Sequence, residues 1–165
     1  MMPQPFIADE SRGYYRVEQP ISADAIIQMA HFLAKQQLSP GQTLDSPEKT
    51  YTYLQTMLQQ LEHEVFGVLW LDQQHRLIVY QELFQGTINQ AQVYPREVVK
   101  HALKHNAAAV ILVHNHPSGN PRPSQSDKAI TQQIKQALQL IEVRLLDHVV
   151  VGREGFVSLA QLGDV

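Results

Sequence analysis

Two histidines and one aspartate, all within residues 114–127, carry the clearest chemical signal in the sequence. His114 and His116 flank a single residue, and Asp127 follows His114 by thirteen positions. Alternate side chains of a β-strand point to the same face, so His114 and His116 can present their imidazoles side by side. Three nitrogen and oxygen ligands leave one position open for water, as in catalytic rather than structural zinc sites. The pattern therefore predicts one zinc ion per chain, held by His114, His116 and Asp127.

Each part of this pattern also has a structural explanation. A His-x-His pair alone is a weak signal, because such histidines are common on surfaces and in cores. Ser124 and Asp127 also fit a capping box, in which each side chain binds the backbone amide of the other residue at a helix start. What favours a metal site is the combination of two same-face histidines, a turn rich in proline and glycine, and an aspartate where a helix begins.

The composition fits one compact domain and restricts the ligands available. The 165 residues are 44% hydrophobic and 18% charged, with no cysteine and eight histidines. A chain without cysteine has no disulfides and no thiolate metal site, so a bound metal must use His, Asp or Glu. No apolar stretch approaches the length of about 20 residues that spans a bilayer, and the N-terminus lacks a basic segment followed by an apolar one. We expect a cytoplasmic protein without a membrane partner.

The charge pattern argues against tight nucleic-acid binding. Thirteen Lys and Arg against sixteen Asp and Glu give a net charge of −3, whereas sequence-independent binding of nucleic acid needs a basic face. A basic cluster near the middle of the chain is the nearest candidate, although such a cluster on a helix is usually a solvated face. Its members are Arg96, Lys100, His101, Lys104 and His105.

The N-terminal quarter of the chain reads as an arm followed by helices. Residues 1–20 are polar and rich in proline, which indicates an extended or loosely packed arm. Ile26, Met29, Ala30 and Leu33 recur at helical spacing and predict a helix over residues 23–37. Ser46 and Pro47 then predict the cap and first turn of a second helix that reaches about residue 61. We expect the arm and first helix to occupy residues 1–45 and the main domain residues 46–165.

The rest of the chain alternates strands and helices. An apolar run at residues 65–71 predicts a strand buried on both faces, paired as a hairpin with the next strand. A later short strand leads directly into His114, and the following helix begins near Asp127. This alternation predicts an α/β fold, with a mixed sheet and helices on both sides. The further elements expected are strands over 77–83, 87–93, 109–113 and 143–151 and helices over 95–105 and 127–141.

The segment from His114 to Asp127 resembles a known motif. His114-Asn115-His116-Pro117 followed by Ser124-x-x-Asp127 is similar to the motif of JAMM, or MPN-plus, metallopeptidases. Three short segments also resemble the RadC-like proteins, a bacterial branch of that family: residues 95–98, 114–119 and 147–148. The resemblance runs from about residue 45 to the end, so the main domain looks like a JAMM catalytic domain with the MPN/JAB fold, which is related to that of cytidine deaminases.

The resemblance also implies roles for two more residues. Glu64, in a Glu-x-x-Gly setting that ends at Gly67, matches the catalytic glutamate of the family; by composition alone, Glu62 and Glu82 are equal candidates. Zinc lowers the pKa of its bound water to about 7. Glu64 would then take a proton from that water and pass it to the leaving amine, while Ser124 would stabilise the developing oxyanion. The implied reaction is hydrolysis of a peptide or isopeptide amide in a substrate protein of unknown identity.

The other histidines and motifs fit alternative functions less well. His101 and His105 have the spacing of a His-Glu-x-x-His zinc helix, but Ala102 replaces the required glutamate. His148 is interpreted as a core histidine with satisfied hydrogen bonds, with contact to the metal site as the alternative. Residues 114–116 spell His-Asn-His, yet the HNH nuclease motif spreads its residues over a longer unit.

Two alternative functions remain open from the sequence. RadC-like proteins carry a DNA-repair name, but their longer members have an N-terminal helix-hairpin-helix region that we do not expect in this chain. A non-catalytic MPN scaffold is the other alternative, and the complete set of ligand residues argues against it. The oligomeric state is not indicated by the sequence.

Overall fold

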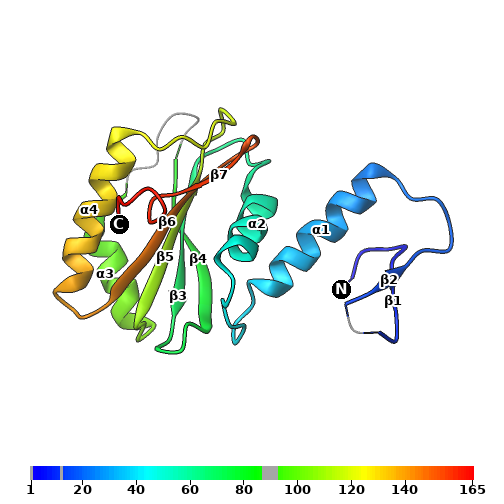
Figure 1. Cartoon of the computed structure of the whole chain (residues 1–165), viewed down its shortest axis with the longest axis horizontal. Helices are drawn as coiled ribbons and strands as arrows, with labels where there is room; N and C mark the ends of the chain where they lie inside the picture. The colour runs from blue at the N-terminus through cyan, green and yellow to red at the C-terminus, as the bar shows by residue number, and fades with distance from the viewer. Residues whose placement is uncertain (1, 12, 87–92) are drawn as a thin grey trace.

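A five-stranded mixed sheet between helices forms the body of the molecule (Figure 1). The structure is a computed structural model that describes residues 2–11, 13–86 and 93–165. The strand expected over 87–93 falls mainly on residues 87–92, outside the described ranges. The elements in chain order are β1 (Ile7–Ala8), β2 (Tyr15–Arg16), α1 (Ala23–Gln37), α2 (Pro47–Leu58), β3 (Val65–Leu71), β4 (Leu77–Gln85), α3 (Pro95–Lys104), β5 (Ala109–Asn115), α4 (Gln125–Gln139), β6 (Arg144–Gly152) and β7 (Gly155–Ser158).

The main sheet has the order β4-β3-β5-β6-β7. β3 pairs with β4 and β5 in antiparallel fashion, β5 and β6 are parallel, and β7 is antiparallel to β6. The parallel pair is connected through α4, as expected because parallel strands need a long crossover. The mixed sheet and the β3–β4 hairpin confirm the fold class predicted from the sequence.

Helices cover both faces of the sheet. Every residue of β3 and β5 is buried, which explains why these segments read as continuous apolar runs. Leu69 and Val113 belong to the core on the side of α2, whereas Trp70 and Leu112 belong to the core that α3 and α4 cover. Since alternate residues of β5 face these two cores, His114 lies on the α4 side and Asn115 on the opposite side.

Helix α1 leads away from the body, with β1 and β2 at its far end (Figure 1). The sequence predicts an apolar stripe on this helix, but Ile26 is 53% exposed and Ala30 is also exposed. Met29 and Ala34 are buried. The difference arises because the N-terminal half of α1 extends beyond the sheet. Within the described residues, no helix is both long and apolar enough to cross a membrane.

Two element boundaries and one additional strand differ from the sequence-based expectation in ways that matter for the site. β5 continues to Asn115, so His114 lies within the strand. α4 begins at Gln125, because Ser124 is its N-cap. β7 was not expected, since its four residues are too few to show a period. This strand leads into the chain end that packs beside β6.

Candidate metal centre

The end of β5 and the start of α4 bring the three expected ligands together. His114 is the second-last residue of β5, and the backbone N–H of His116, just beyond the strand, donates to the carbonyl oxygen of Val151 at 2.8 Å. This bond continues the pairing with β6 and holds His116 in place. Asp127 lies in the first turn of α4. The side chains of His114, His116 and Asp127 are 1%, 19% and 15% exposed, so the group lies at the edge of the core.

The distances between the ligand atoms suit a single cation. The Nε2 atoms of His114 and His116 are 3.0 Å apart. The Asp127 carboxylate oxygens lie 3.3 Å from Nε2 of His114 and 3.4 Å from Nε2 of His116. Zinc–nitrogen bonds of 2.0–2.1 Å in a tetrahedron place neighbouring ligands roughly 3.3 Å apart. Among the residues that the structure describes, His114, His116 and Asp127 form the one group of three or more His, Asp or Glu side chains that could hold a metal ion.

A chain of hydrogen bonds fixes which nitrogen of His114 carries its proton. Thr131 Oγ1 donates to the backbone carbonyl of Asp127 at 2.5 Å, so it must accept from Nδ1 of His148, also at 2.5 Å. Burial holds the pKa of His148 well below its usual value, which keeps this ring neutral and leaves a lone pair on its Nε2. That atom lies 2.8 Å from Nδ1 of His114, which must therefore donate. The Nε2 atom of His114 is left with a free lone pair.

A contact with a backbone carbonyl likewise leaves a lone pair on Nε2 of His116. Its Nδ1 lies 2.9 Å from the carbonyl oxygen of Asn120, which can only accept. In the neutral ring, Nε2 therefore also carries a lone pair. Two lone pairs and a carboxylate thus converge without a shared proton, and this donor set fits a bound metal cation.

The electrostatics of the group agree with this donor set. Protonation of His116 would allow a hydrogen bond to Asp127, which raises the pKa of His116, and the Glu64 carboxylate adds to the effect. Burial opposes ionisation of Asp127, but the contacts with His114 and His116 outweigh it and lower the pKa of the carboxyl. The centre therefore attracts positive charge, either as a proton on His116 or as a metal ion.

Ser124 serves both as a cap of α4 and as a partner of the Asp127 carboxylate. Its hydroxyl accepts from the backbone N–H of Asp127 at 3.1 Å and donates to Oδ2 of Asp127 at 2.7 Å. The N–H of Ser124 donates to the same Oδ2 at 2.6 Å. The capping box that the sequence also predicts is therefore present. It does not exclude metal binding, because it orients the carboxylate and leaves Oδ1 toward His114.

Glu64 immediately precedes β3 and is partly exposed. Because β3 and β5 are antiparallel with Phe66 opposite His114, residue 64 lies toward the end of the sheet that carries His116. The other two glutamates considered from the sequence are exposed. Glu62 lies in the bend before Glu64, and Glu82 lies on the outer strand β4, where it accepts a hydrogen bond from Gln85. Of the three glutamates, Glu64 is the one that contributes to the raised pKa of His116.

The turn between His116 and Ser124 rests on the β6–β7 turn. Gly152 approaches it so closely that a Cβ atom there would lie 2.1 Å from the carbonyl oxygen of Gly119. The same oxygen accepts from the N–H of Glu154 at 3.1 Å. Gly119 itself has φ +96, a left-handed conformation that favours glycine. The glycine in His-Pro-Ser-Gly is therefore required by the turn that carries His116.

Sequence reasoning did not identify Thr131, and it gave Asn115 no role of its own. His148 combines the two roles considered for it, because it is fully buried and contacts His114. Thr131 lies four residues after Asp127 on one face of α4, a spacing that could have pointed to it. Contacts from β6 to β5 cannot be read from spacing, since they depend on strand order.

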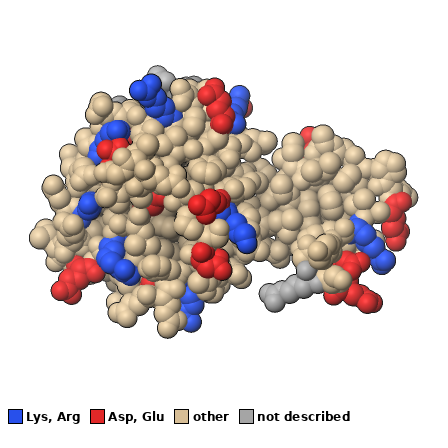
Figure 2. All heavy atoms as spheres, in the orientation of Figure 1, with Lys and Arg blue, Asp and Glu red and all other residues tan. Residues whose placement is uncertain are grey.

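Two other regions considered for function lie apart from this centre. His101 and His105 stack beside Trp70, and Nε2 of His105 lies 3.1 Å from Gln81. Glu97 lies 3.9 Å from Arg96 and 3.5 Å from Lys100, which offsets the basic cluster on α3. Figure 2 shows basic and acidic side chains interspersed over the visible face.

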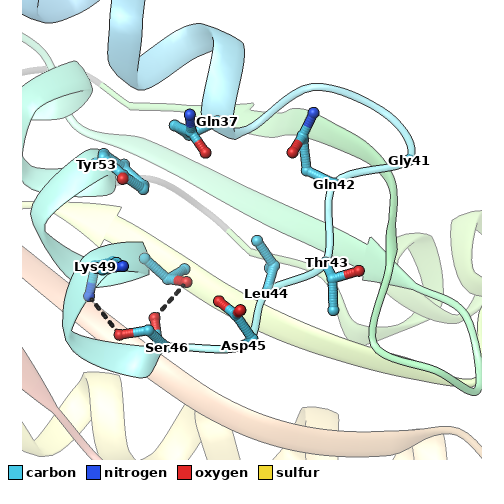
Figure 3. A pocket seen from close by; sticks show the side chains of 10 residues that line it. Gln37, Gly41, Gln42, Thr43, Leu44, Asp45, Ser46, Lys49 and Tyr53 are labelled. Carbon is cyan, nitrogen blue, oxygen red and sulfur yellow. Dashed lines mark hydrogen bonds between the residues drawn. The ribbon is translucent and has the colours of Figure 1, made fainter. Parts of the chain in front are cut away.

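A cavity of about 400 Å³ lies between the end of α1 and the start of α2, away from the metal centre (Figure 3). It is lined mainly by polar residues, including Gln42, Asp45 and Lys49. Ser46 at its edge is occupied as the N-cap of α2, where its hydroxyl accepts from the N–H of Lys49. None of the residues expected at the metal centre lines this cavity.

Comparison with known proteins agrees with the fold. The model of the family described as RadC-like JAB domain matches residues 44–164. The chain therefore belongs to the RadC-like JAB domain family. The matched segment contains the whole five-stranded sheet and the three candidate metal ligands.

The relatives are known as UPF0758 proteins. The chain is 54% identical over 139 residues to one from Leptothrix cholodnii, a match that covers 84% of the chain and 63% of the relative. It is 50% identical over 152 residues to one from Vibrio cholerae, covering 92% of the chain and 96% of that protein. A third, from Marinomonas sp., is 57% identical over 139 residues, 84% of the chain and 62% of the relative. The chain thus spans less than two thirds of some of these relatives.

Proposed function

We propose that the chain is a zinc-dependent metallopeptidase that hydrolyses a peptide or isopeptide amide. The observation that carries this proposal is the convergence of two histidine lone pairs and one carboxylate, with separations of 3.0–3.4 Å between the ligand atoms. Nitrogen and oxygen ligands of this number are typical of catalytic zinc sites, which keep a position open. His114, His116 and Asp127 would hold the ion.

Bound zinc would supply a nucleophile at neutral pH by lowering the pKa of a coordinated water to about 7. Glu64 is the proposed general base. Its carboxylate is partly exposed and contributes to the raised pKa of His116. From there it would accept a proton and later deliver it to the leaving amine. This role needs a carboxylate that is close to the metal but is not itself a ligand.

Ser124 is the proposed donor to the oxygen of the scissile carbonyl. Its hydroxyl donates to Oδ2 of Asp127, with 2.7 Å between the two oxygen atoms. Donation to the substrate requires this hydrogen to turn from Asp127 toward the developing negative charge. The backbone N–H of Ser124 would keep Oδ2 of Asp127 occupied during that change.

The direct test is a panel of peptide and isopeptide substrates incubated with the zinc-loaded chain and with Glu64→Gln. Loss of the base is expected to lower kcat by about 10²–10⁴-fold, with zinc content unchanged. Glu62→Gln is the matched control, because Glu62 is an exposed glutamate two residues away and should leave kcat unchanged. Equal cleavage by Glu64→Gln and the parent would contradict the assignment of the base. A chain that takes up no zinc would instead favour a non-catalytic scaffold.

A further inference from the structure

Asn115 lies between the two ligand histidines but faces the other way. Its side chain is 1% exposed and points to the face of the sheet opposite His114 and His116. There it makes two hydrogen bonds to a single stretch of backbone. Its Oδ1 accepts from the N–H of Val65 at 2.8 Å, and its Nδ2 donates to the carbonyl of His63 at 3.0 Å. The residue between these two contacts is Glu64.

These bonds replace the regular pairing at the point where the strands separate. The ladder between β3 and β5 ends with Phe66 opposite His114. A side chain that binds His63 and Val65 must offer one acceptor and one donor, and an amide supplies both. The carbonyl of Glu64 in turn accepts from the N–H of Gly86 at 2.8 Å. The backbone on both sides of Glu64 is therefore held, although Glu64 precedes the strand.

We propose that Asn115 is a positioning residue that sets the place of Glu64 relative to the metal centre. The inference rests on the proposed function, in which Glu64 is the base. Asn115 is bonded covalently to both His114 and His116. One segment of three residues therefore contains two proposed ligands and also holds the backbone around the proposed base. A shift of this strand end would therefore move the two histidines and the backbone of Glu64 together.

The catalytic test is a double-mutant cycle with Asn115→Ala and Glu64→Gln. Misplacement of a reacting group by about 1 Å can lower the rate by roughly 10²-fold, so Asn115→Ala should lower kcat by about that factor, with KM and zinc affinity unchanged. In the Glu64→Gln background, Asn115→Ala should have no further effect on kcat. An equal loss in both backgrounds, or a loss of zinc, would overturn the inference.

A matched control separates positioning from general destabilisation. Ser158→Ala removes another buried side chain with two hydrogen bonds, one to Asp147 and one from the N–H of Gln161. It lies on β7, two strands away from β5. Its kcat should match the parent even where its stability falls as much as that of Asn115→Ala. A similar fall in kcat for both variants would overturn the inference.

A second measurement does not depend on activity. Amide hydrogen exchange of Val65 should be at least about tenfold faster in zinc-loaded Asn115→Ala than in the parent, because its acceptor is gone, whereas Leu112 in the middle of β5 should be unaffected. An unchanged Val65 rate would overturn the inference whatever the activity. Faster exchange in a chain that cleaves nothing would overturn the proposed function and still support the hold of Asn115 on the backbone around Glu64.

Discussion

At the scale of single residues, the metal centre is defined by the direction of its hydrogen bonds. His114 donates to His148, His148 donates to Thr131, and Thr131 donates to the carbonyl of Asp127. These bonds lead from one candidate ligand to the backbone of another. Each bond has one possible direction once Thr131 donates to that carbonyl. A single hydroxyl on α4 therefore determines which nitrogen of His114 keeps the lone pair that a cation would need.

Thr131→Val tests this chain with little change in side-chain shape. Valine removes the hydroxyl, so His148 loses its acceptor and the orientation of His114 is no longer fixed. Removal of such outer contacts typically lowers metal affinity by about 10–100-fold, and we expect a weakening of zinc binding in that range. Thr131→Ser keeps the hydroxyl and should bind zinc like the parent. Competition with a chromophoric chelator measures both variants, and equal affinity of Thr131→Val and the parent would contradict the role of the chain.

At the scale of elements, the turn that carries His116 depends on the β6–β7 turn beneath it. Gly119 and Pro121 lie against the backbone at Gly152, where no Cβ fits. The bonds from His116 to Val151 and from Glu154 to Gly119 join the two turns. The position of His116 is thus set by a segment more than thirty residues later in the chain.

Gly152→Ala should displace the turn that carries His116. The new methyl group would lie 2.1 Å from the carbonyl oxygen of Gly119, and backbone atoms must move to relieve the overlap. We expect a loss of about 1–3 kcal/mol in the free energy of unfolding, measured by urea denaturation, together with weaker zinc binding. Arg153→Ala, at the exposed neighbouring position, is the control and should change neither. Normal stability and zinc affinity in Gly152→Ala would show that the two turns do not depend on each other.

The elements that the sequence predicts well are those with a local pattern. α1 and β3 have the predicted bounds, because helical spacing and a continuous apolar run report them directly. The residues of the centre could likewise be proposed because all three lie in one short segment. β7 and the contact of His148 with His114 could not be predicted, since they follow from strand order, which depends on packing. The bounds of the domains remain a prediction.

At the scale of the whole molecule, a buried carboxylate joins the helical layer to the last strands. Asp147 on β6 accepts from the hydroxyls of Tyr51 on α2 and Ser158 on β7, at 2.5 and 2.7 Å. It also accepts from the backbone N–H groups of His148 and Ala160, at 2.7 and 2.9 Å. Four donors satisfy the buried carboxylate, and they tie α2 to the strand that carries His148.

From the hydrogen bond between Tyr51 and Asp147 we predict a loss of folding stability at high pH. Burial, followed by the hydrogen bond to Asp147, raises the pKa of Tyr51 from 10.0 to about 12. Because the folded pKa lies above the unfolded one, the contribution of Tyr51 is complete below pH 10 and is lost as the pH rises toward 12. Tyr51→Phe should be less stable than the parent by about 1–2 kcal/mol at pH 8, and its free energy of unfolding should fall less between pH 10 and 12.

Urea unfolding at pH 8, 10 and 12 measures this difference. Tyr53→Phe, on the same helix, is the matched control and should follow the pH dependence of the parent. If Tyr51→Phe and the parent lose stability in parallel above pH 10, the raised pKa of Tyr51 does not contribute to folding. The comparison concerns stability alone and is independent of any catalytic role.

The most direct measurement is the zinc content of the chain after removal of metal with a chelator and reloading, determined by elemental mass spectrometry for the parent and for His116→Ala. We predict one zinc per parent chain and a substoichiometric amount in the variant, because two ligands hold the ion far less tightly than three. His116 lies at the surface of the centre, so its removal should leave the fold intact. A parent chain that takes up no zinc, or a His116→Ala variant that retains it equally well, would contradict the account.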